Sequence, residues 1–128
     1  MEEHICKPLQ HYSVKFQDMA SRTDRYGKLE NPDGYGKRTG DCGDTIEIYF
    51  YVLEDRIQML TFQVDGCSST VACGNALSSL IEGQSIGDSW QLTPENIIEY
   101  LESLPADHYH CAELAVGAFY KALTNYRE

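Results

Sequence analysis

Three of the five cysteines stand where one kind of local sequence pattern gives way to another. Cys42 lies in the glycine-rich stretch TGDCGD before an alternating apolar run, Cys67 follows a second such run in VDGCSST, and Cys111 opens a helical pattern in HYHCAELA. The positive end of a helix dipole favours thiolate, so we expect helix N-termini to lower the pKa values of the Cys67 and Cys111 thiols. Thiolate is the form that binds metal ions and carries sulfur. If the three junctions meet at one end of the domain, they form a soft metal site.

Two further donor groups adjoin these cysteines. Asp44 lies two residues after Cys42, and His110 directly precedes Cys111. Three sulfur ligands completed by a carboxylate or an imidazole suit tetrahedral zinc or an iron–sulfur cluster. The three cysteines are separated by 25 and 44 residues, which matches no local zinc-finger spacing. The tertiary fold must therefore assemble such a site.

The remaining cysteines fit a metal site less well. A single cysteine is more often a small buried hydrophobic residue than a ligand, and we favour this interpretation for Cys73, inside a helical run, and for Cys6. The neighbours of Cys42 indicate a different role. Gly40 and Gly43 allow a tight backbone turn and leave the thiol uncrowded, which a core cysteine would not need.

The elements that must position these side chains follow from periodicity. Alternating Ile46, Ile48, Phe50 and Val52 predict a strand over residues 45–53, and a polar turn then leads to a second strand that should pair with the first as an antiparallel hairpin. Capping residues and apolar spacing predict three helices after it. The expected order is a weak N-terminal helix within residues 1–20, a loop over 21–41, strands at 45–53 and 57–64, and helices at 68–83, 93–104 and 111–126. This order predicts an α+β fold, with helices packed on one face of a small antiparallel sheet.

Length and charge limit the function classes. A chain of 128 residues fits one domain over 1–128, long enough to bury a core without disulfides. With 10 Lys and Arg residues against 20 Asp and Glu residues, the formal charge of −10 argues against nucleic acid as a partner. The sequence has no apolar run long enough to span a membrane and no secretory signal pattern at its start. We therefore expect a soluble, cytoplasmic protein with reduced cysteines.

The motifs around the cysteines resemble those of the IscU/NifU-type iron–sulfur cluster assembly scaffolds. CGD at residues 42–44, GC followed by small residues at 66–69, LP at 104–105 and HCAELA at 110–115 occur in that family's order and at similar separations. The resemblance covers roughly residues 10 to 127. It implies a single NifU N-terminal-like (IscU) domain with the SufE/NifU-like fold.

The resemblance also implies a ligand set and a set of partners. Cys42, Cys67 and Cys111 would hold a transient [2Fe–2S] cluster, with Asp44 or His110 as the fourth ligand, and zinc could occupy the same site when iron is absent. A cysteine desulfurase of the IscS/NifS type would deliver sulfur, a ferredoxin or frataxin-like protein could assist, and apo iron–sulfur proteins would receive the cluster. Such a scaffold is a binding protein and not an enzyme, and it acts as a monomer or as a homodimer that can share a cluster.

One loop departs from the family pattern. Residues 104–108 read LPADH where the bacterial chaperone-recognition run reads LPPVK, so His108 stands in the place of a lysine. The resemblance therefore leaves dependence on the dedicated chaperone pair open. For His108 itself, we favour a solvent-facing loop residue over a ligand.

Three other functions remain as alternatives. In a SufU-like zinc sulfurtransferase, one thiolate, best Cys111 beside His110, would accept a persulfide, although the short interval between Cys67 and Cys111 lacks the insertion of that branch. A structural zinc domain would unfold when its metal is removed. A cysteine hydrolase using Cys111 and His110 is disfavoured, because neighbouring residues on a helix diverge by about 100°.

Overall fold

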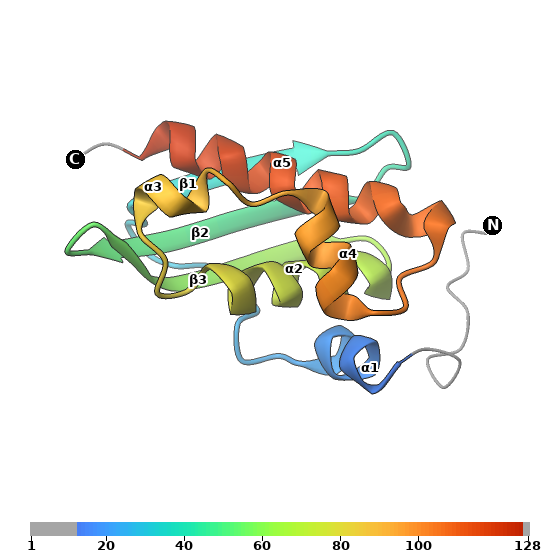
Figure 1. The fold of residues 1–128 in the computed structure, drawn as a ribbon. Coiled ribbons are helices and arrows are strands. Elements are labelled where there is room, and N and C mark those ends of the chain that lie inside the picture. Colours follow the sequence, from blue (N-terminus) through green and yellow to red (C-terminus); the bar gives the residue numbers. More distant parts are fainter. Residues whose placement is uncertain (1–12, 127–128) are drawn as a thin grey trace.

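A three-stranded antiparallel sheet is the framework of the computed structural model, which describes residues 13–126. The strands are β1 (Gly34–Thr39), β2 (Thr45–Leu53) and β3 (Arg56–Asp65), in the order β1-β2-β3. The helices are α1 (Val14–Ser21), α2 (Ser68–Ile81), α3 (Ile86–Ser89), α4 (Pro94–Leu101) and α5 (Tyr109–Asn125), with the 3₁₀ helix η2 (Ala106–His108) before α5. Helices α2 and α5 lie across one face of the sheet (Figure 1), so the predicted α+β fold is confirmed.

The predicted hairpin is β2–β3, and its register explains which side chains reach the core. Ile46, Ile48 and Phe50 alternate along β2 and are fully buried against the helices. A register shift between Tyr51 and Val52 changes the alternation in the partner strand, so that Ile57, Leu60 and Phe62 of β3 are buried. The bulge lets both strands present their large apolar side chains to the same face. The predicted strands are confirmed, and β3 extends one residue further at each end.

The predicted loop over residues 21–41 is wrong in its last part, because β1 pairs with β2 along the edge of the sheet. The glycines of GYGKRT suggested a turn, yet two of them make room for close packing. A Cβ atom on Gly36 would lie 2.2 Å from the carbonyl oxygen of Ala118 in α5, and one on Gly34 would lie 2.2 Å from the ring of Phe50. Glycine in this strand allows close backbone approach.

The helices form where their capping signals predict them. Thr93 and Asn96 form a reciprocal capping box at the start of α4, with Pro94 in its first turn. Helix α4 ends at Leu101, three residues before the expected end, and α5 begins at Tyr109, two residues before its expected start. The short α3 was not expected. Helix α1 begins at Val14, and the expected helical residues before Ser13 lie outside the described part of the chain, as does Cys6.

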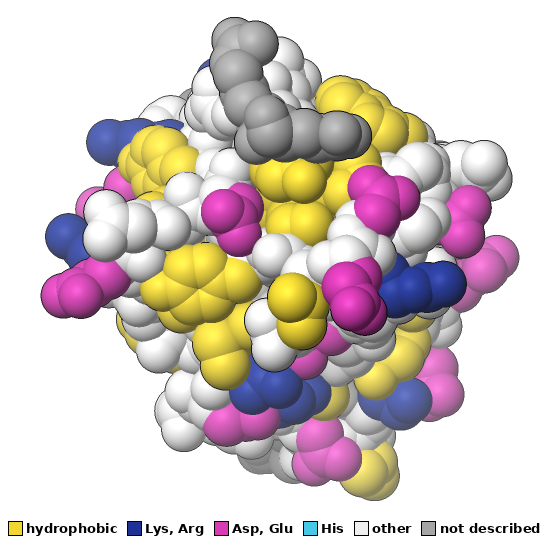
Figure 2. Space-filling view, turned by 90° about the vertical axis from the view of Figure 1, so that its left-hand side faces the viewer, with side chains coloured by type: hydrophobic (Ala, Val, Ile, Leu, Met, Phe, Trp, Pro, Cys, Tyr) yellow, Lys and Arg dark blue, Asp and Glu magenta, His cyan; other side chains and the backbone are white. Residues whose placement is uncertain are grey.

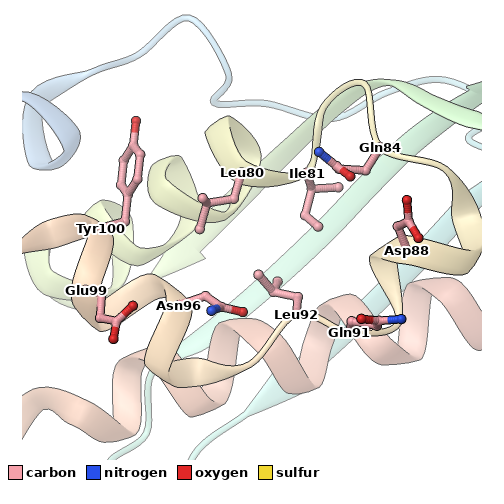
Figure 3. Close-up of a pocket in the computed structure, with 9 residues that line it drawn as sticks. All are labelled: Leu80, Ile81, Gln84, Asp88, Gln91, Leu92, Asn96, Glu99 and Tyr100. Atoms are coloured by element: carbon pink, nitrogen blue, oxygen red, sulfur yellow. The ribbon is translucent and has the colours of Figure 1, made fainter.

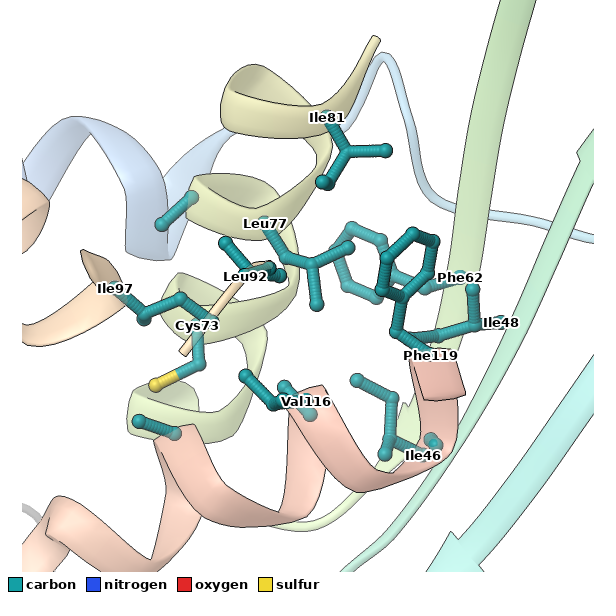
Figure 4. Packing of buried hydrophobic residues seen from close by; sticks show 14 of the residues in the cluster. Ile46, Ile48, Phe62, Cys73, Leu77, Ile81, Leu92, Ile97, Val116 and Phe119 are labelled. Carbon is teal, nitrogen blue, oxygen red and sulfur yellow. The ribbon is translucent and has the colours of Figure 1, made fainter. Parts of the chain in front are cut away.

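The core fills the space between the sheet, α2, α4 and α5 (Figure 4). Cys73 points into it beside Leu77, Ile97 and Val116, and its side chain is fully buried, as predicted for a core cysteine. The buried amide of Asn75 ties α1 to α2, since its Nδ2 donates to the carbonyl oxygen of Met19 at 2.6 Å. Among the helices of residues 13–126, none is long and apolar enough to cross a membrane.

Candidate metal centre

Three junctions of the fold meet at one end of the molecule, on the right in Figure 1. The β1–β2 loop carries Cys42, the N-cap of α2 is Cys67, and Cys111 lies in the first turn of α5. The opposite end, at the β2–β3 turn, shows hydrophobic, acidic and basic side chains interspersed over its surface (Figure 2). The elements that carry the three cysteines are therefore neighbours, although these residues are far apart in the sequence.

The tightest cluster of donor atoms at this end is formed by Cys67, His108 and Cys111. One ligand atom from each lies within 4.8 Å of the other two. Cys111 is fully buried, whereas Cys67 and His108 are half-buried. Two sulfurs and one imidazole nitrogen are a donor set that suits zinc and other soft or borderline divalent ions.

His108 was considered as a ligand but interpreted as a solvent-facing loop residue, and the structure places it half-buried beside the two thiols. It ends η2 directly before α5, so it stands three residues ahead of Cys111. Its Nδ1 atom is buried and has no hydrogen-bond partner in the described part of the chain. The sequence does contain a signal for this position, because residues three apart at a helix start lie on the same face.

Cys42 and His110 share a neighbouring cleft. Cys42 is exposed, and it lines a cleft of about 420 Å³ together with His110, Arg38 and Glu113. The Nε2 atom of His110 lies 3.7 Å from the sulfur of Cys111, so this imidazole stands between the cleft and the cluster of donors. The cleft provides access from solvent to the edge of the metal centre.

The turn that presents Cys42 has the geometry expected from its glycines. The Gly40 amide donates to the carbonyl oxygen of Asp44 at 2.9 Å, and the Gly43 amide donates to that of Gly40 at 3.0 Å. Gly43 has a φ of +94°, a backbone angle that residues with a Cβ atom rarely adopt. The turn therefore holds Cys42 at its exposed tip with little steric crowding.

Asp44 caps the N-terminus of α2. The residue is 4% exposed, and its carboxylate accepts hydrogen bonds from the Cys67 amide at 3.2 Å and from the Thr70 hydroxyl at 2.8 Å. Gly66 leaves room for it, since a Cβ atom there would lie 2.3 Å from the carboxyl carbon. An anionic group at a helix N-terminus is favourable. Asp44 thus fixes the backbone of Cys67, the residue that bridges β3 and α2.

We expect Asp44→Ala to lower the free energy of unfolding of the metal-free protein by about 1–3 kcal/mol, because a buried hydroxyl and a backbone amide lose their acceptor. Urea denaturation followed by circular dichroism measures this change. The exposed Asp41 provides the control, and Asp41→Ala should leave the midpoint nearly unchanged. Equal midpoints for Asp44→Ala and the wild-type protein would show that the cap contributes nothing.

Of the two thiols expected to ionise easily, Cys111 is fully buried. A hydrogen bond with Cys67, and then burial, raise the pKa of Cys111 well above its usual range. The prediction that the helix N-terminus enriches Cys111 in thiolate is therefore wrong, because the hydrogen bond with Cys67 and burial favour the protonated thiol. Burial likewise raises the pKa of Cys73. A metal ion must displace a proton from Cys111 to bind there.

The adjacent His110 and Cys111 come closer than expected. The separation of 3.7 Å between Nε2 and Sγ is within hydrogen-bonding range for sulfur, so the expectation that neighbouring residues diverge is wrong here. The thiol is nevertheless fully buried and its pKa is raised, which makes it a poor nucleophile. These properties argue against a cysteine hydrolase.

A larger groove elsewhere on the molecule lacks the chemistry of a metal site. It has a volume of about 640 Å³ and lies between the end of α2, the α3 region and α4 (Figure 3). Leu80, Ile81 and Leu92 form apolar parts of its lining, and amide and carboxylate side chains surround them. Its lining residues include no cysteine or histidine. The metal centre is therefore at the end where the thiols meet.

Comparison with known proteins identifies the family. A family model described as the NifU-like N-terminal domain matches residues 11–128. The chain belongs to this family. Over 116 residues, this NifU-like chain is 32% identical to the iron-sulfur cluster assembly scaffold protein IscU 1 of Archaeoglobus fulgidus, covering 90% of the chain and 76% of that protein. The predicted resemblance to IscU/NifU-type proteins is confirmed.

Solved structures with low sequence identity share the NifU-like fold. The N-terminal part of a nitrogen-fixing NifU-like protein from Brucella abortus matches with a TM-score of 0.73 at 14% identity, covering 88% of this chain and 92% of that one. FiSufU from Fervidobacterium islandicum matches with a TM-score of 0.74 at 20% identity, covering 91% and 99%. At these identities, the two structures support the fold alone.

Proposed function

We propose that this NifU-like protein is a scaffold on which a transient [2Fe–2S] cluster is assembled and from which it passes to apo-proteins. The observation that carries the proposal is the meeting of Cys67, His108 and Cys111 within 4.8 Å, beside a cleft that presents the exposed Cys42. The similarity to a protein named as an iron-sulfur cluster assembly scaffold supports this reading of the site. A scaffold holds its cargo and performs no turnover, so we propose a binding protein and not an enzyme.

The proposed cluster ligands are Cys42, Cys67 and Cys111, with His110 or Asp44 as the fourth. The contacts favour His110, because it lies 3.7 Å from the Cys111 sulfur and shares the cleft of Cys42. Asp44 is instead engaged by the Cys67 amide and the Thr70 hydroxyl. One ligand that is not a thiolate would weaken the hold on the cluster, as release to an acceptor requires.

The sulfur would come from a cysteine desulfurase as a persulfide, and Cys42 is the thiol best placed to receive it. Cys42 is exposed, whereas Cys111 is fully buried. Persulfide sulfur must gain two electrons to become the sulfide of a cluster, so the proposal includes an electron donor of the ferredoxin type, with a frataxin-like protein as a further assistant. Apo iron–sulfur proteins would then accept the cluster.

One observation favours a zinc-bound sulfurtransferase as a second candidate. The Cys67–His108–Cys111 cluster suits zinc while Cys42 lies outside it, so a metal ion and a persulfide acceptor could coexist. In that function, Cys42 replaces Cys111 as the acceptor because Cys111 is buried. Zinc should then increase the turnover of the desulfurase. For a scaffold, zinc should instead slow cluster formation by occupying the thiols.

Cluster transfer tests the scaffold role directly. Iron, cysteine, a desulfurase and a thiol reductant are supplied without oxygen, and the visible absorbance of the cluster is followed before and after an apo-ferredoxin is added. We expect the absorbance to develop on this protein and then to be lost as the ferredoxin gains its own spectrum. A cluster that forms and stays would indicate a resident iron–sulfur protein. No cluster, together with zinc-stimulated desulfurase turnover, would indicate the sulfurtransferase.

A further inference from the structure

We propose that the cleft beside Cys42 binds a zwitterionic amino-acid persulfide, such as the persulfide of free cysteine, with its carboxylate on Arg38 and its ammonium group on Glu113. The outer sulfur of this ligand would then face the Cys42 thiol. The inference rests on the proposed function, because it names a small-molecule source for the sulfur that Cys42 receives. The recognition of the ligand is tested without iron and without a desulfurase.

The cleft contains charged side chains of both signs. Its volume is about 420 Å³, within the range of small-molecule pockets, and its lining includes Arg38, Asp41 and Glu113. Among residues 13–126, no side-chain hydrogen bond or ion pair engages Arg38 or Glu113. Both groups are therefore available to a ligand that brings a carboxylate and an ammonium group of its own.

Arg38 is held against α5 by close packing at Gly117. A Cβ atom on Gly117 would lie 2.9 Å from both Cδ and Cζ of Arg38, so the end of this side chain lies over the backbone of the helix. Glu113 precedes Gly117 by four residues, which is one turn of about 5.4 Å on the same face of α5. The carboxylate and ammonium group of an amino acid are joined through one carbon atom, so they suit two opposite charges at neighbouring positions.

The thiol and an apolar side chain line another part of the cleft. A Cβ atom on Gly40 would lie 3.6 Å from Cδ1 of Leu114 and 3.8 Å from the Cys42 sulfur. Leu114 precedes Gly117 by three residues, on the same side of the helix as the packed Arg38. The cleft therefore offers an apolar surface beside the thiol, which suits the methylene group and the polarizable sulfur atoms of the ligand.

The charge of the chain favours an amino acid over a ligand that carries a carboxylate alone. The formal net charge is −10, and the cleft itself has two carboxylates against one guanidinium. An additional carboxylate would be repelled by this charge, whereas the ammonium group of an amino acid offsets its own carboxylate. The carboxylate can still accept two parallel hydrogen bonds from arginine.

Sulfur transfer in this cleft is a thiol–persulfide exchange. The Cys42 thiolate attacks the outer sulfur of the protonated persulfide, a new S–S bond forms, and the S–S bond of the donor breaks. The electron pair of the broken bond leaves with free cysteine as a thiolate, which takes a proton from water, and the transferred sulfur keeps its hydrogen. The exchange needs no oxidant or reductant. Cys42 gains a persulfide, and cysteine is released.

Symmetric disulfides with and without the two recognition groups test the binding site. L-Cystine carries both groups, cystamine lacks the carboxylates, and dithiodipropionate lacks the ammonium groups. Each forms a mixed disulfide with Cys42 and releases one thiol, and peptide mass mapping of metal-free protein measures the rate. The ratio of two such rates on one protein cancels any change in the exposure or reactivity of Cys42 itself.

Arg38→Gln is expected to lower the rate with cystine, relative to that with cystamine, at least about fivefold, the upper end for an exposed ion pair. The reason is that the carboxylate loses its partner. Lys37→Gln removes the same charge from the neighbouring position of β1, whose side chain lies on the other face of the strand, so its ratio should stay within about twofold of wild type. A wild-type ratio in Arg38→Gln, or an equal fall in Lys37→Gln, would overturn the proposal.

Glu113→Gln tests the other half of the site. The rate with cystine, relative to that with dithiodipropionate, should fall at least about threefold, because the ammonium group loses its partner. Asp41→Asn is the matched comparison, since Asp41 lines the same cleft from the β1–β2 loop. An unchanged ratio in Glu113→Gln, or a larger fall in Asp41→Asn, would contradict the assignment of the ammonium group to Glu113.

The sulfur step is tested with cysteine persulfide prepared from cystine and sulfide. The Cys42 peptide of wild-type protein should gain one sulfur atom, and that of Arg38→Gln should gain it at least about fivefold more slowly. Equal rates, or no added sulfur on wild-type Cys42, would overturn the proposal. Ratios that depend on Arg38 in a protein that assembles no cluster would sustain the inference and reject the scaffold. Cluster assembly with unchanged ratios in Arg38→Gln would do the reverse.

Discussion

Cys67→Ser and Cys111→Ser are each expected to remove most of the cluster absorbance that wild-type protein develops in anaerobic reconstitution with iron, cysteine, a desulfurase and a thiol reductant. The two sulfurs lie within 4.8 Å of each other at the N-termini of α2 and α5. A serine hydroxyl is a far weaker ligand for iron than a thiolate. Absorbance per protein and acid-labile sulfide measure the effect.

Cys42 extends this prediction, and Cys73 provides its control. Cys42→Ser should also diminish the cluster, whereas Cys73→Ala should retain it because Cys73 is buried in the core. Reconstitution of all three serine variants to the wild-type level would reject the assigned ligands. If Cys73→Ala and Cys67→Ser are both folded and lose the same cluster absorbance, the assignment of Cys73 to the core and Cys67 to the cluster site is contradicted.

Gly36→Ala is expected to lower the free energy of unfolding by about 3 kcal/mol, the upper end of the usual cost of overpacking. The new Cβ atom would lie 2.2 Å from the carbonyl oxygen of Ala118 and 2.5 Å from the amide nitrogen of Ala122. Both atoms belong to the backbone of α5, so the contact is relieved only if β1 or the helix moves. A change of this size is a large part of the total stability of a small domain.

Urea denaturation of the metal-free protein measures this effect. Gly87→Ala is the matched control, because a Cβ atom there meets nothing within 4 Å among the described residues and the change should be nearly neutral. Movement of α5 would also displace Cys111, so Gly36→Ala should weaken metal binding as well. Equal midpoints for the two glycine variants would show that β1 and α5 are less tightly packed than the structure indicates.

The strands and helices that carry strong local patterns could be predicted from the sequence. The alternation of Ile46, Ile48 and Phe50 gave β2, and the Thr93–Pro94 signal gave the start of α4. Strand β1 could not be predicted in this way. Its glycines are needed for contacts with Ala118 and Phe50 that are distant in the sequence, so the local pattern resembled a loop.

Those parts of the metal centre that depend on residue type and local position could be predicted from the sequence. The parts that depend on tertiary contacts could not. The motifs singled out Cys42, Cys67 and Cys111, and the structure places their elements at one end of the fold. It engages Asp44 in capping α2 and places a ring nitrogen of His108 within 4.8 Å of two thiol sulfurs. The raised pKa of Cys111 likewise depends on burial and on Cys67, which the position at a helix start does not reveal.

The central claim is that this end of the molecule assembles iron with inorganic sulfide. Analysis of metal and acid-labile sulfide in protein purified without oxygen tests it most directly, since sulfide separates a cluster from a simple metal ion. The account predicts iron and acid-labile sulfide in equal amounts, with both lost in Cys67→Ser. Bound metal without acid-labile sulfide, in wild-type protein purified and reconstituted without oxygen, would contradict it.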